Sequence, residues 1–254
     1  MRRGRPRPGL VSLWLLAHVA GCHASPASQP VAFRPSSPGL EVASLEGPEG
    51  APVWALRWDP DRFALSVAWS PSGLSVPGGI PPGWVAVGNG GYFEQDLRPS
   101  GLLIVDGRQI AAASGGSGAL VLDGAGRPSL VRLHEARPGA DGSVLQLWPF
   151  LIEPGGRDGI HHDDQRRSRR SAIGLDARGR GLWVVVPRGG VSLYELMGIC
   201  QKLGAVVAAN LDGGPSTGFA LATPPLWRTP SETPVANALV LRARAARPSG
   251  RASP

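Results

Sequence analysis

One acidic residue follows an apolar run in the C-terminal half of the chain and is itself followed by two glycines. The apolar run is 205–209, and the next residues, 210–217, read Asn-Leu-Asp-Gly-Gly-Pro-Ser-Thr. Ligand sites tend to lie at the carboxyl ends of strands in α/β sheets, so Asp212 is a candidate catalytic carboxylate. The backbone N–H groups of Gly213 and Gly214 can approach an anion closely. The alternative is that Asp212 only caps the following turn.

Three further segments combine polar residues with glycine or aromatic residues. They are Asn-Gly-Gly-Tyr-Phe-Glu-Gln-Asp at 89–96, Gln-Leu-Trp-Pro-Phe-Leu-Ile at 146–152, and Arg-Arg-Ser-Ala-Ile-Gly at 169–174. The guanidinium of Arg170 can bind a phosphate through two parallel hydrogen bonds. Asn89 and Asn210 offer donors and acceptors to sugar hydroxyls. Apolar faces for a sugar ring are offered by three aromatic residues, Tyr92, Phe93 and Trp148.

Simpler interpretations exist for these residues as well. Arg170 could pair with a surface acid, and Asn89 could occupy a left-handed turn position. Glu94 and Asp96 fit a solvated loop. Taken one at a time, these short motifs therefore predict little about function.

A separate polar cluster offers a metal-binding alternative. His161, His162, Asp163 and Asp164 are adjacent in the sequence. They are potential zinc ligands, but four neighbouring residues of one flexible segment cannot all point at one ion. A polar loop is the competing interpretation. A serine hydrolase built from Ser216, one of these histidines and Asp212 lacks the Gly-x-Ser-x-Gly motif. Nothing in the sequence requires a cofactor, but binding of a divalent metal stays an open alternative.

Taken together and in this order, the four segments resemble the phosphodiester glycosidase family. The family pattern has Asn-Gly-Gly-x-Phe, Gln-x-x-Pro-x-Leu-Val, Arg-(Thr/Ser)-Ala-Ile-Gly and Leu-Asp-Gly-Gly-Gly-Ser-Ser blocks. The matching positions are 89–93, 146–152, 170–174 and 211–217, and the resemblance spans roughly residues 60–241. Three positions depart from the pattern: Pro215 replaces a glycine, Thr217 replaces a serine, and Trp148 stands where glycine is frequent.

The resemblance implies a hydrolase that cleaves a sugar-1-phosphodiester in an envelope or extracellular phosphorylated glycan or glycolipid. Asp212 would be the catalytic carboxylate, with Glu94 or Asp96 as a second one. The implied substrate-binding residues are Asn89, Gly90, Arg170, Asn210, Gly213, Gly214, Ser216 and Thr217. Because proline has no N–H, Pro215 restricts the anion site to the neighbouring amides. The alternative is an envelope protein that binds a phosphorylated glycan without cleaving it, an interpretation that Pro215 and Trp148 favour.

The periodicity of the chain predicts an α+β fold with a mixed β-sheet. Short branched and aromatic runs separated by glycine turns indicate a strand-rich N-terminal half, with a hairpin turn at Asp106-Gly107. In the C-terminal half, a strand at 182–186 is followed by a capping box at 192–195, an amphipathic helix, and a strand at 205–211. This pattern predicts a β-α-β unit whose two strands form a parallel pair.

The two ends of the chain differ from the predicted domain at 40–242. Residues 1–21 have a cationic start, an apolar stretch and the ending Val-Ala-Gly before Cys22, which resembles a lipoprotein signal. We therefore expect an exported protein, lipid-anchored through Cys22 to a membrane of the cell envelope. A Pro- and Ser-rich tether is expected at 22–39, and a basic disordered tail at 243–254.

The basic character of the chain does not point to nucleic acid. Lys and Arg number 26 against 19 Asp and Glu, but four of the arginines lie within residues 1–21. Removing these leaves 22 basic residues (26 − 4) and a net charge of +3 (22 − 19). Further arginines lie in the predicted tail, so the domain itself is close to neutral and no nucleic-acid partner is expected.

Overall fold

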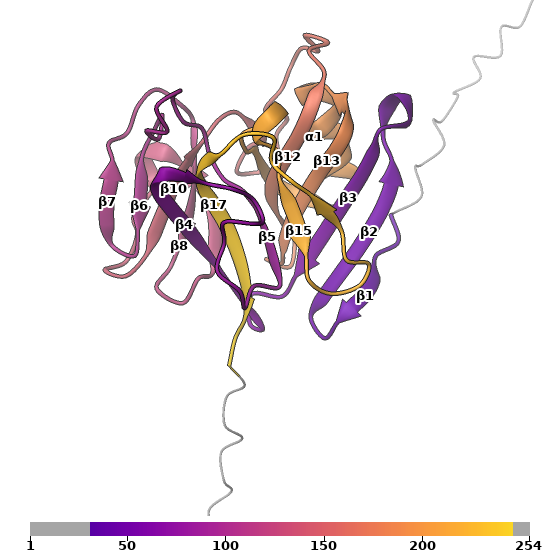
Figure 1. Ribbon diagram of the computed structural model, residues 1–254. Helices are drawn as coiled ribbons and strands as arrows, with labels where there is room; N and C mark the ends of the chain where they lie inside the picture. Colours follow the sequence, from indigo (N-terminus) through magenta and orange to yellow (C-terminus); the bar gives the residue numbers. More distant parts are fainter. Residues whose placement is uncertain (1–30, 246–254) are drawn as a thin grey trace, which may run out of the picture.

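The computed structural model describes residues 31–245, and over this range it contains three antiparallel sheets and one α-helix (Figure 1). The largest sheet has, in spatial order, β1 (Arg34–Ser37), β2 (Leu40–Glu46), β3 (Pro52–Trp58), β13 (Gly181–Val191), β12 (Ser168–Asp176), β14 (Ala205–Asn210) and β11 (Phe150–Ile152). A second sheet has β7 (Arg108–Ala111), β6 (Leu103–Val105), β10 (Ser143–Leu147), β8 (Gly118–Leu122) and β9 (Pro128–Arg132). The third has β16 (Arg228–Thr229), β15 (Phe219–Leu221), β5 (Ala86–Asn89), β17 (Val235–Ala243) and β4 (Phe63–Leu74).

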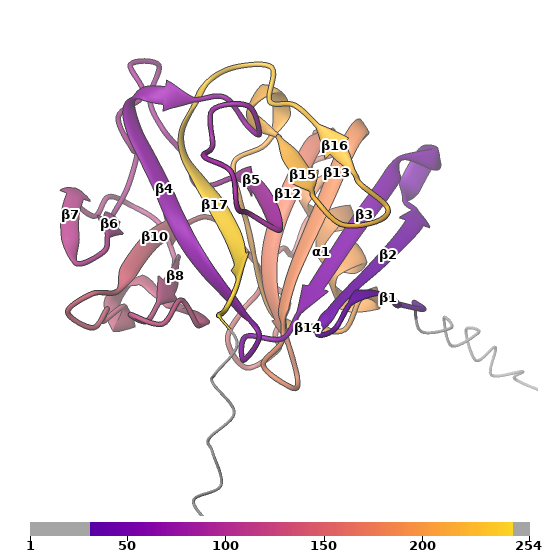
Figure 2. The same ribbon diagram turned by 60° about the horizontal axis from the view of Figure 1, so that its bottom comes forward.

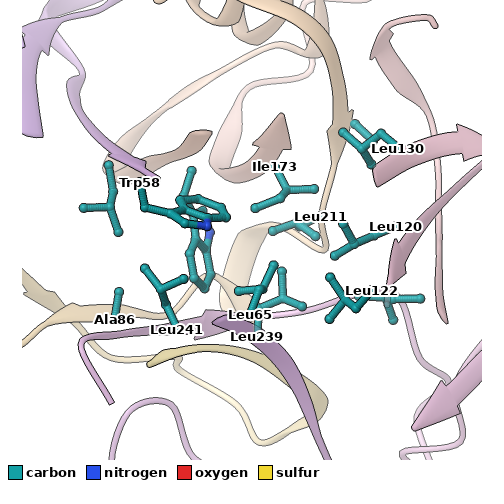
Figure 3. Packing of buried hydrophobic residues seen from close by; sticks show 14 of the residues in the cluster. Trp58, Leu65, Ala86, Leu120, Leu122, Leu130, Ile173, Leu211, Leu239 and Leu241 are labelled. Atoms are coloured by element: carbon teal, nitrogen blue, oxygen red, sulfur yellow. The ribbon is translucent and has the colours of Figure 1, made fainter. Parts of the chain in front are cut away.

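The three sheets meet around one hydrophobic core (Figure 3). Trp58 and Ile173 enter it from the seven-stranded sheet, Leu120 from the second sheet, and Leu239 from the third. Leu211, directly after β14, is fully buried in the same core. The residue before Asp212 is therefore fixed by packing against three sheets, which holds the start of the following loop in place.

Both faces of the seven-stranded sheet are buried in its middle. Along β13, Trp183 and Val185 point into the core between the sheets, while Leu182 and Val184 belong to a second cluster beneath the helix. Successive side chains of a strand point to opposite faces, so a strand covered on both sides reads as a continuous apolar run.

Helix α1 (Leu193–Lys202) begins and ends as the sequence predicts. The Ser192 hydroxyl accepts a hydrogen bond from the Glu195 N–H, and the Glu195 carboxylate accepts one from the Ser192 N–H. After the helix, Gly204 has a φ of 86°, a conformation that favours glycine. The buried residues of α1 pack against β11, β14 and the strands beside them.

The α+β class and the strand-rich N-terminal half are confirmed, but the predicted parallel pair is wrong. Strands β13 and β14 do not pair with each other, because β12 lies between them and pairs antiparallel with both. Every strand pairing of the described residues is antiparallel, so the sheets are not mixed. Residues 169–174 were interpreted from the sequence only as a site motif, but they form the middle of the central strand β12.

Ordered structure extends beyond both predicted domain boundaries. β1 lies within 22–39, the range predicted as a tether, and it pairs with β2. At the other end, β17 continues to Ala243, where it pairs with β4 (Figure 2). The predicted signal sequence, Cys22, half of the tether and most of the tail lie outside the described residues. Within residues 31–245, no helix has the length and apolar character needed to cross a membrane.

Short turns complete the architecture. Three single turns of 3-10 helix occur among the described residues: η1 (Pro48–Gly50), η2 (Leu133–Glu135) and η3 (Gly214–Ser216). The hairpin between β6 and β7 turns at Asp106 and Gly107, which have φ values of 47° and 76°. The hairpin predicted from this Asp-Gly pair is confirmed.

Candidate active site

Three chain segments that are distant in sequence meet at the loop containing Asp212. The Asp212 N–H donates to the Gly90 carbonyl (3.0 Å), and the Asn89 Nδ2 donates to the Asp212 carbonyl (2.7 Å). One residue earlier, the Leu211 N–H donates to the Ser171 carbonyl (2.9 Å). The structure thus brings together the ends of β5, β12 and β14, which carry three of the four segments singled out in the sequence.

Asp212 is a half-buried carboxylate without a basic partner. Its Oδ1 accepts a hydrogen bond from the Gly213 N–H (2.9 Å), and the Ser216 hydroxyl also bonds to the carboxylate. Within residues 31–245 it forms no salt bridge. Burial raises the pKa of Asp212 above the usual aspartate range, and the two hydrogen bonds oppose this increase only in part. The side chain does interact with its own turn, as the capping interpretation predicted, but it does so with its charge incompletely compensated.

Arg170 lies beside the Asp212 loop with part of its guanidinium unused. Its Nε donates to the Val191 carbonyl (3.1 Å) and its Nη2 to the Arg166 carbonyl (2.8 Å). Nη1 lies 3.6 Å from the position that a Cβ on Gly213 would occupy. Burial lowers the pKa of Arg170, and the charges of Tyr92 and Asp164 act in the opposite direction. Among the described residues Arg170 has no salt bridge, so the predicted surface ion pair is absent and Nη1 can bind an anion.

The glycine turn after Asp212 offers fewer free amides than the sequence suggests. The Gly213 N–H is bonded to Asp212, and the Ser216 N–H donates to the Gly213 carbonyl (3.3 Å). The Gly214 N–H has no hydrogen-bond partner within the part of the chain that the structure describes. Gly214 has a φ of 59°, and Pro215 is exposed on the first turn of η3. The predicted set of three amides is therefore reduced to one free N–H next to an exposed proline.

Tyr92 connects the Asp212 loop to Arg170 electrostatically. Its hydroxyl accepts a hydrogen bond from the Asn210 Nδ2. Burial, followed by the negative charge of Asp212, raises the pKa of Tyr92 to about 12, while Asn210 and Arg170 lower it by smaller amounts. The phenol is consequently protonated at neutral pH. The Asn210 Oδ1 is buried and has no partner among the described residues.

Asn89 and Gly90 are fully enclosed and have structural partners. Asn89 is in β5, and its Oδ1 accepts a hydrogen bond from the Gly218 N–H (3.3 Å). It does not have a left-handed backbone, so that alternative is wrong. Gly90 is required by close packing, because a Cβ there would lie 2.0 Å from the Asn237 Oδ1. Both residues hold the Asp212 loop from beneath, and direct contact of either with substrate stays a prediction.

Two structural residues were missed in the sequence. Asn237 in β17 is fully buried, and its Oδ1 accepts a hydrogen bond from the Gly91 N–H (2.7 Å). Arg169 donates to the carbonyls of Thr217 and Pro230 and pairs with Glu232. Thr217 is itself fully buried, and its hydroxyl has no partner among the described residues. An asparagine inside the apolar run 235–241 was the one sequence signal that could have identified Asn237.

The two carboxylates predicted as partners of Asp212 are exposed and locally satisfied. Glu94 accepts a hydrogen bond from the Ser100 hydroxyl (2.7 Å). Asp96 pairs with Arg98, with 2.6 Å between Oδ2 and Nε. Neither contributes to the raised pKa of Asp212. A catalytic role for Glu94 or Asp96 stays a prediction without a contact to support it.

The histidine and aspartate cluster does not form a metal site in this fold. His161, His162 and Asp164 are exposed. Over residues 31–245, no three His, Cys, Asp or Glu side chains are placed so that they could share a metal ion. Asp163 instead bonds to Ser192 and to the Gln165 N–H. The polar-loop interpretation therefore describes this segment.

Comparison with known proteins defines the class. A family model described as phosphodiester glycosidase matches residues 82–242, a range that contains all the site residues described above. The chain belongs to the phosphodiester glycosidase family. No curated protein sequence gave a significant match.

Three solved structures are similar to this chain in fold. The zebrafish N-acetylglucosamine-1-phosphodiester alpha-N-acetylglucosaminidase catalytic domain, auto-inhibited by its pro-peptide, has a TM-score of 0.62 at 16% identity, covering 85% of this chain and 87% of that one. A hypothetical protein from Synechocystis has a TM-score of 0.60 at 18% identity, covering 86% and 64%. A putative exported protein from Burkholderia pseudomallei has a TM-score of 0.53 at 17% identity, covering 75% and 74%. At these identities the three structures show a shared fold.

Proposed function

We propose that this protein hydrolyses the bond between the anomeric carbon of a sugar and the phosphate of a phosphodiester. The observation that carries this proposal is the Asp212 loop. Its half-buried carboxylate has no basic partner among the described residues, and the Arg170 Nη1 lies 3.6 Å from where a Cβ on the next residue, Gly213, would be. A sugar-1-phosphodiester has an anionic phosphate next to an electrophilic carbon. This loop offers a carboxylate at Asp212 and, near the following residue, the guanidinium of Arg170.

Arg170 and the Gly214 N–H hold the phosphate in this mechanism. Two backbone carbonyls already orient the guanidinium, so little rotational freedom is lost when Nη1 binds an anionic oxygen. A free N–H on a glycine turn is a suitable second donor. The Tyr92 hydroxyl accepts from Asn210, which leaves its own hydrogen available for a substrate oxygen.

Asp212 acts at the anomeric carbon. As the bond between this carbon and the phosphate oxygen breaks, its electron pair leaves with the phosphate, and positive charge develops on the sugar ring. A water oxygen bonds to the carbon and gives its proton to Asp212, whose raised pKa favours proton uptake. The products are a free sugar and a phosphomonoester. Because phosphate is a good leaving group, no second carboxylate is required near Asp212.

Direct product analysis tests the proposal. Purified protein is incubated with an α-N-acetylglucosaminyl 1-phosphodiester, chosen because the zebrafish enzyme of similar fold is named for that substrate. Free sugar and phosphomonoester are then measured by mass spectrometry. The expected result is equal release of both products by the wild type and loss of release in Asp212→Asn. Undiminished release by a folded Asp212→Asn protein would disprove the role of this residue.

A second candidate function is binding of a phosphorylated glycan without cleavage. It is favoured by the exposed Pro215 and by the single free amide of the Asp212 loop, which offers weaker anion binding than a glycine-rich turn would. Saturable binding of the same compound in calorimetry, with no product after prolonged incubation, would establish this function and exclude the hydrolase.

We also propose an envelope location, supported by the signal-like sequence that ends at Cys22. Expression of the full chain in bacteria, followed by membrane fractionation and mass spectrometry of the N-terminus, tests this location. The expected result is a diacylglycerol-modified Cys22 in the membrane fraction, and release of a Cys22→Ser variant from it. An unmodified Cys22 in the mature protein would contradict lipid anchoring.

A further inference from the structure

An apolar pocket adjoins the Asp212 loop, and the loop interactions described so far do not use it. The pocket has a volume of about 280 Å³, at the small end of the range for ligand sites. Its walls are formed by residues of the segments 92–103 and 145–148, together with Gly115. This size fits a single ring or a short chain.

Hydrogen bonds link the pocket to the candidate active site. Tyr92 lines the pocket, and its hydroxyl is bonded to Asn210, two residues before Asp212. Trp148 also lines the pocket, and the carbonyl of the next residue, Pro149, accepts a hydrogen bond from the Asn210 N–H (3.0 Å). A group held in the pocket would therefore extend from a substrate whose reacting bond is next to Asp212.

Two polar side chains of the pocket, Gln146 and Ser100, are already engaged with the protein. The Gln146 Oε1 accepts from the Leu102 N–H (2.8 Å) and the Ser114 N–H (3.2 Å). Its Nε2 donates to the carbonyls of Ser114 (3.1 Å) and Gly115 (2.7 Å), so the amide has no capacity left. The Ser100 hydroxyl donates to Glu94. A hydroxyl-rich sugar would find few partners here, so the three aromatic residues are poorly suited to the sugar-ring contact predicted from the sequence.

The walls are closely packed and mostly apolar. A Cβ on Gly101 would lie 2.7 Å from the Gln146 Cδ, so little space separates these two wall residues. Trp148 is 57% exposed at the rim, which is unusual for so large an apolar side chain. When an apolar ligand covers an exposed aromatic ring beside an apolar pocket, burial of the ring surface stabilises the complex.

We propose that this pocket binds an apolar ring or short chain on the far side of the substrate phosphate, which makes the protein selective for glycosyl phosphodiesters with an apolar aglycone. This selectivity rests on the proposed hydrolase function. The sugar would lie on the Asp212 side, the phosphate at Arg170, and the apolar group between Tyr92, Phe93 and Trp148.

The test compares two synthetic substrates that differ only in the aglycone. Both are α-N-acetylglucosaminyl 1-phosphodiesters, one of benzyl alcohol and one of ethylene glycol, so both leaving groups are phosphomonoesters of primary alcohols. For the wild type we expect a KM about tenfold or more lower for the benzyl compound, as expected for burial of one aromatic ring. In Trp148→Ala this ratio should fall to about threefold or less. Tyr194→Ala is the matched control, because Tyr194 is 45% exposed on α1 and does not line the pocket.

The possible outcomes separate the pocket from the catalytic activity. Equal KM values for both compounds in the wild type would overturn the pocket proposal while leaving the hydrolase intact. If the wild type cleaves neither compound, the hydrolase proposal fails, and calorimetry with the same two compounds then decides on the pocket. Tighter binding of the benzyl compound, lost in Trp148→Ala and kept in Tyr194→Ala, supports the pocket, and equal binding overturns it.

Discussion

Carboxylates in two neighbouring loops have opposite surroundings. In the 94–100 turn, Glu94 and Asp96 are exposed, and each is satisfied by a side chain of the same turn, Ser100 or Arg98. In the 210–217 loop, Asp212 is half-buried, lacks a basic partner among the described residues, and has a raised pKa. A solvated and paired acid ionises readily, and its surroundings change little when a ligand binds. A partly desolvated acid without a cationic partner instead favours taking up a proton or stabilising a positive charge. This comparison makes Asp212 the candidate for catalysis.

The largest expected effect is the difference between the acids of the two loops. Asp212→Asn should lower kcat by roughly 10²- to 10⁴-fold, since it removes the group that accepts a proton and stabilises positive charge. Glu94→Gln and Asp96→Asn should retain activity within about threefold, because solvent replaces their local bonds. Steady-state kinetics on one phosphodiester substrate measures all three variants. A loss in Glu94→Gln as large as that in Asp212→Asn would show that the exposed turn reaches the substrate.

Two adjacent arginines provide the next test. Arg170→Met should raise KM by about 10- to 100-fold through loss of a charge-assisted hydrogen bond, with a small change in Tm. Arg169→Met should instead lower Tm, because Arg169 connects Thr217, Pro230 and Glu232. Kinetics and thermal melting of both variants measure the two effects. A fall in Tm for Arg170→Met with an unchanged KM would reverse these assignments.

The raised pKa of Asp212 predicts a pH dependence of activity and an effect on stability. The activity should fall as the pH decreases through this pKa, so the acidic limb should lie above the usual aspartate value of about 4. Since the folded-state pKa exceeds the unfolded one, the contribution of Asp212 to stability decreases as the pH rises through the folded-state pKa.

Thermal melting of Asp212→Asn therefore provides an independent measurement. At pH 7 the variant should melt at a higher temperature than the wild type, and the difference should shrink at acidic pH, where Asp212 is protonated. A variant that melts below the wild type at pH 7 would show that the bonds of Asp212 to Gly213 and Ser216 outweigh its desolvation.

The smallest expected effect comes from Pro215. Pro215→Ala would add one N–H beside the free Gly214 N–H, and the KM for a phosphodiester should fall by less than tenfold. The unfolded chain gains freedom, so stability should fall by about 0.4–1 kcal/mol. Kinetics and denaturant unfolding measure these changes. An increase in KM would indicate that the proline itself contacts the substrate.

Local features of the fold could be predicted from the sequence, and long-range pairing could not. The Ser192 and Glu195 capping box and the Asp106-Gly107 turn depend on neighbouring residues, so short patterns identify them. The position of β12 between β13 and β14 depends on which strands pair across the whole chain. No local period contains this information, so the predicted parallel pair was wrong.

The candidate site was predictable in its main residues but not in how they are used. The sequence pointed to Asp212 and Arg170, which the structure places at one loop. It could not show that the Gly213 and Ser216 amides are used internally, because hydrogen bonding depends on the backbone conformation of the turn. Asn237 was missed because its partner Gly91 is far away in the sequence.

The hydrogen bond between the Gly91 N–H and Asn237 has a consequence for how the protein folds. Asn237 lies in β17, which pairs with β4. Residues 63–74 can therefore form this strand pair only after residues 235–243 have been synthesised. During synthesis on the ribosome, Asp212 emerges before Asn237. Until Asn237 has emerged, the Gly91 N–H, next to the Gly90 carbonyl that bonds to Asp212, lacks its hydrogen-bond acceptor. Pairing of strands so distant in sequence is slow. We therefore expect the support beneath the candidate site to form late in folding, after the C-terminal strand β17 has paired with β4.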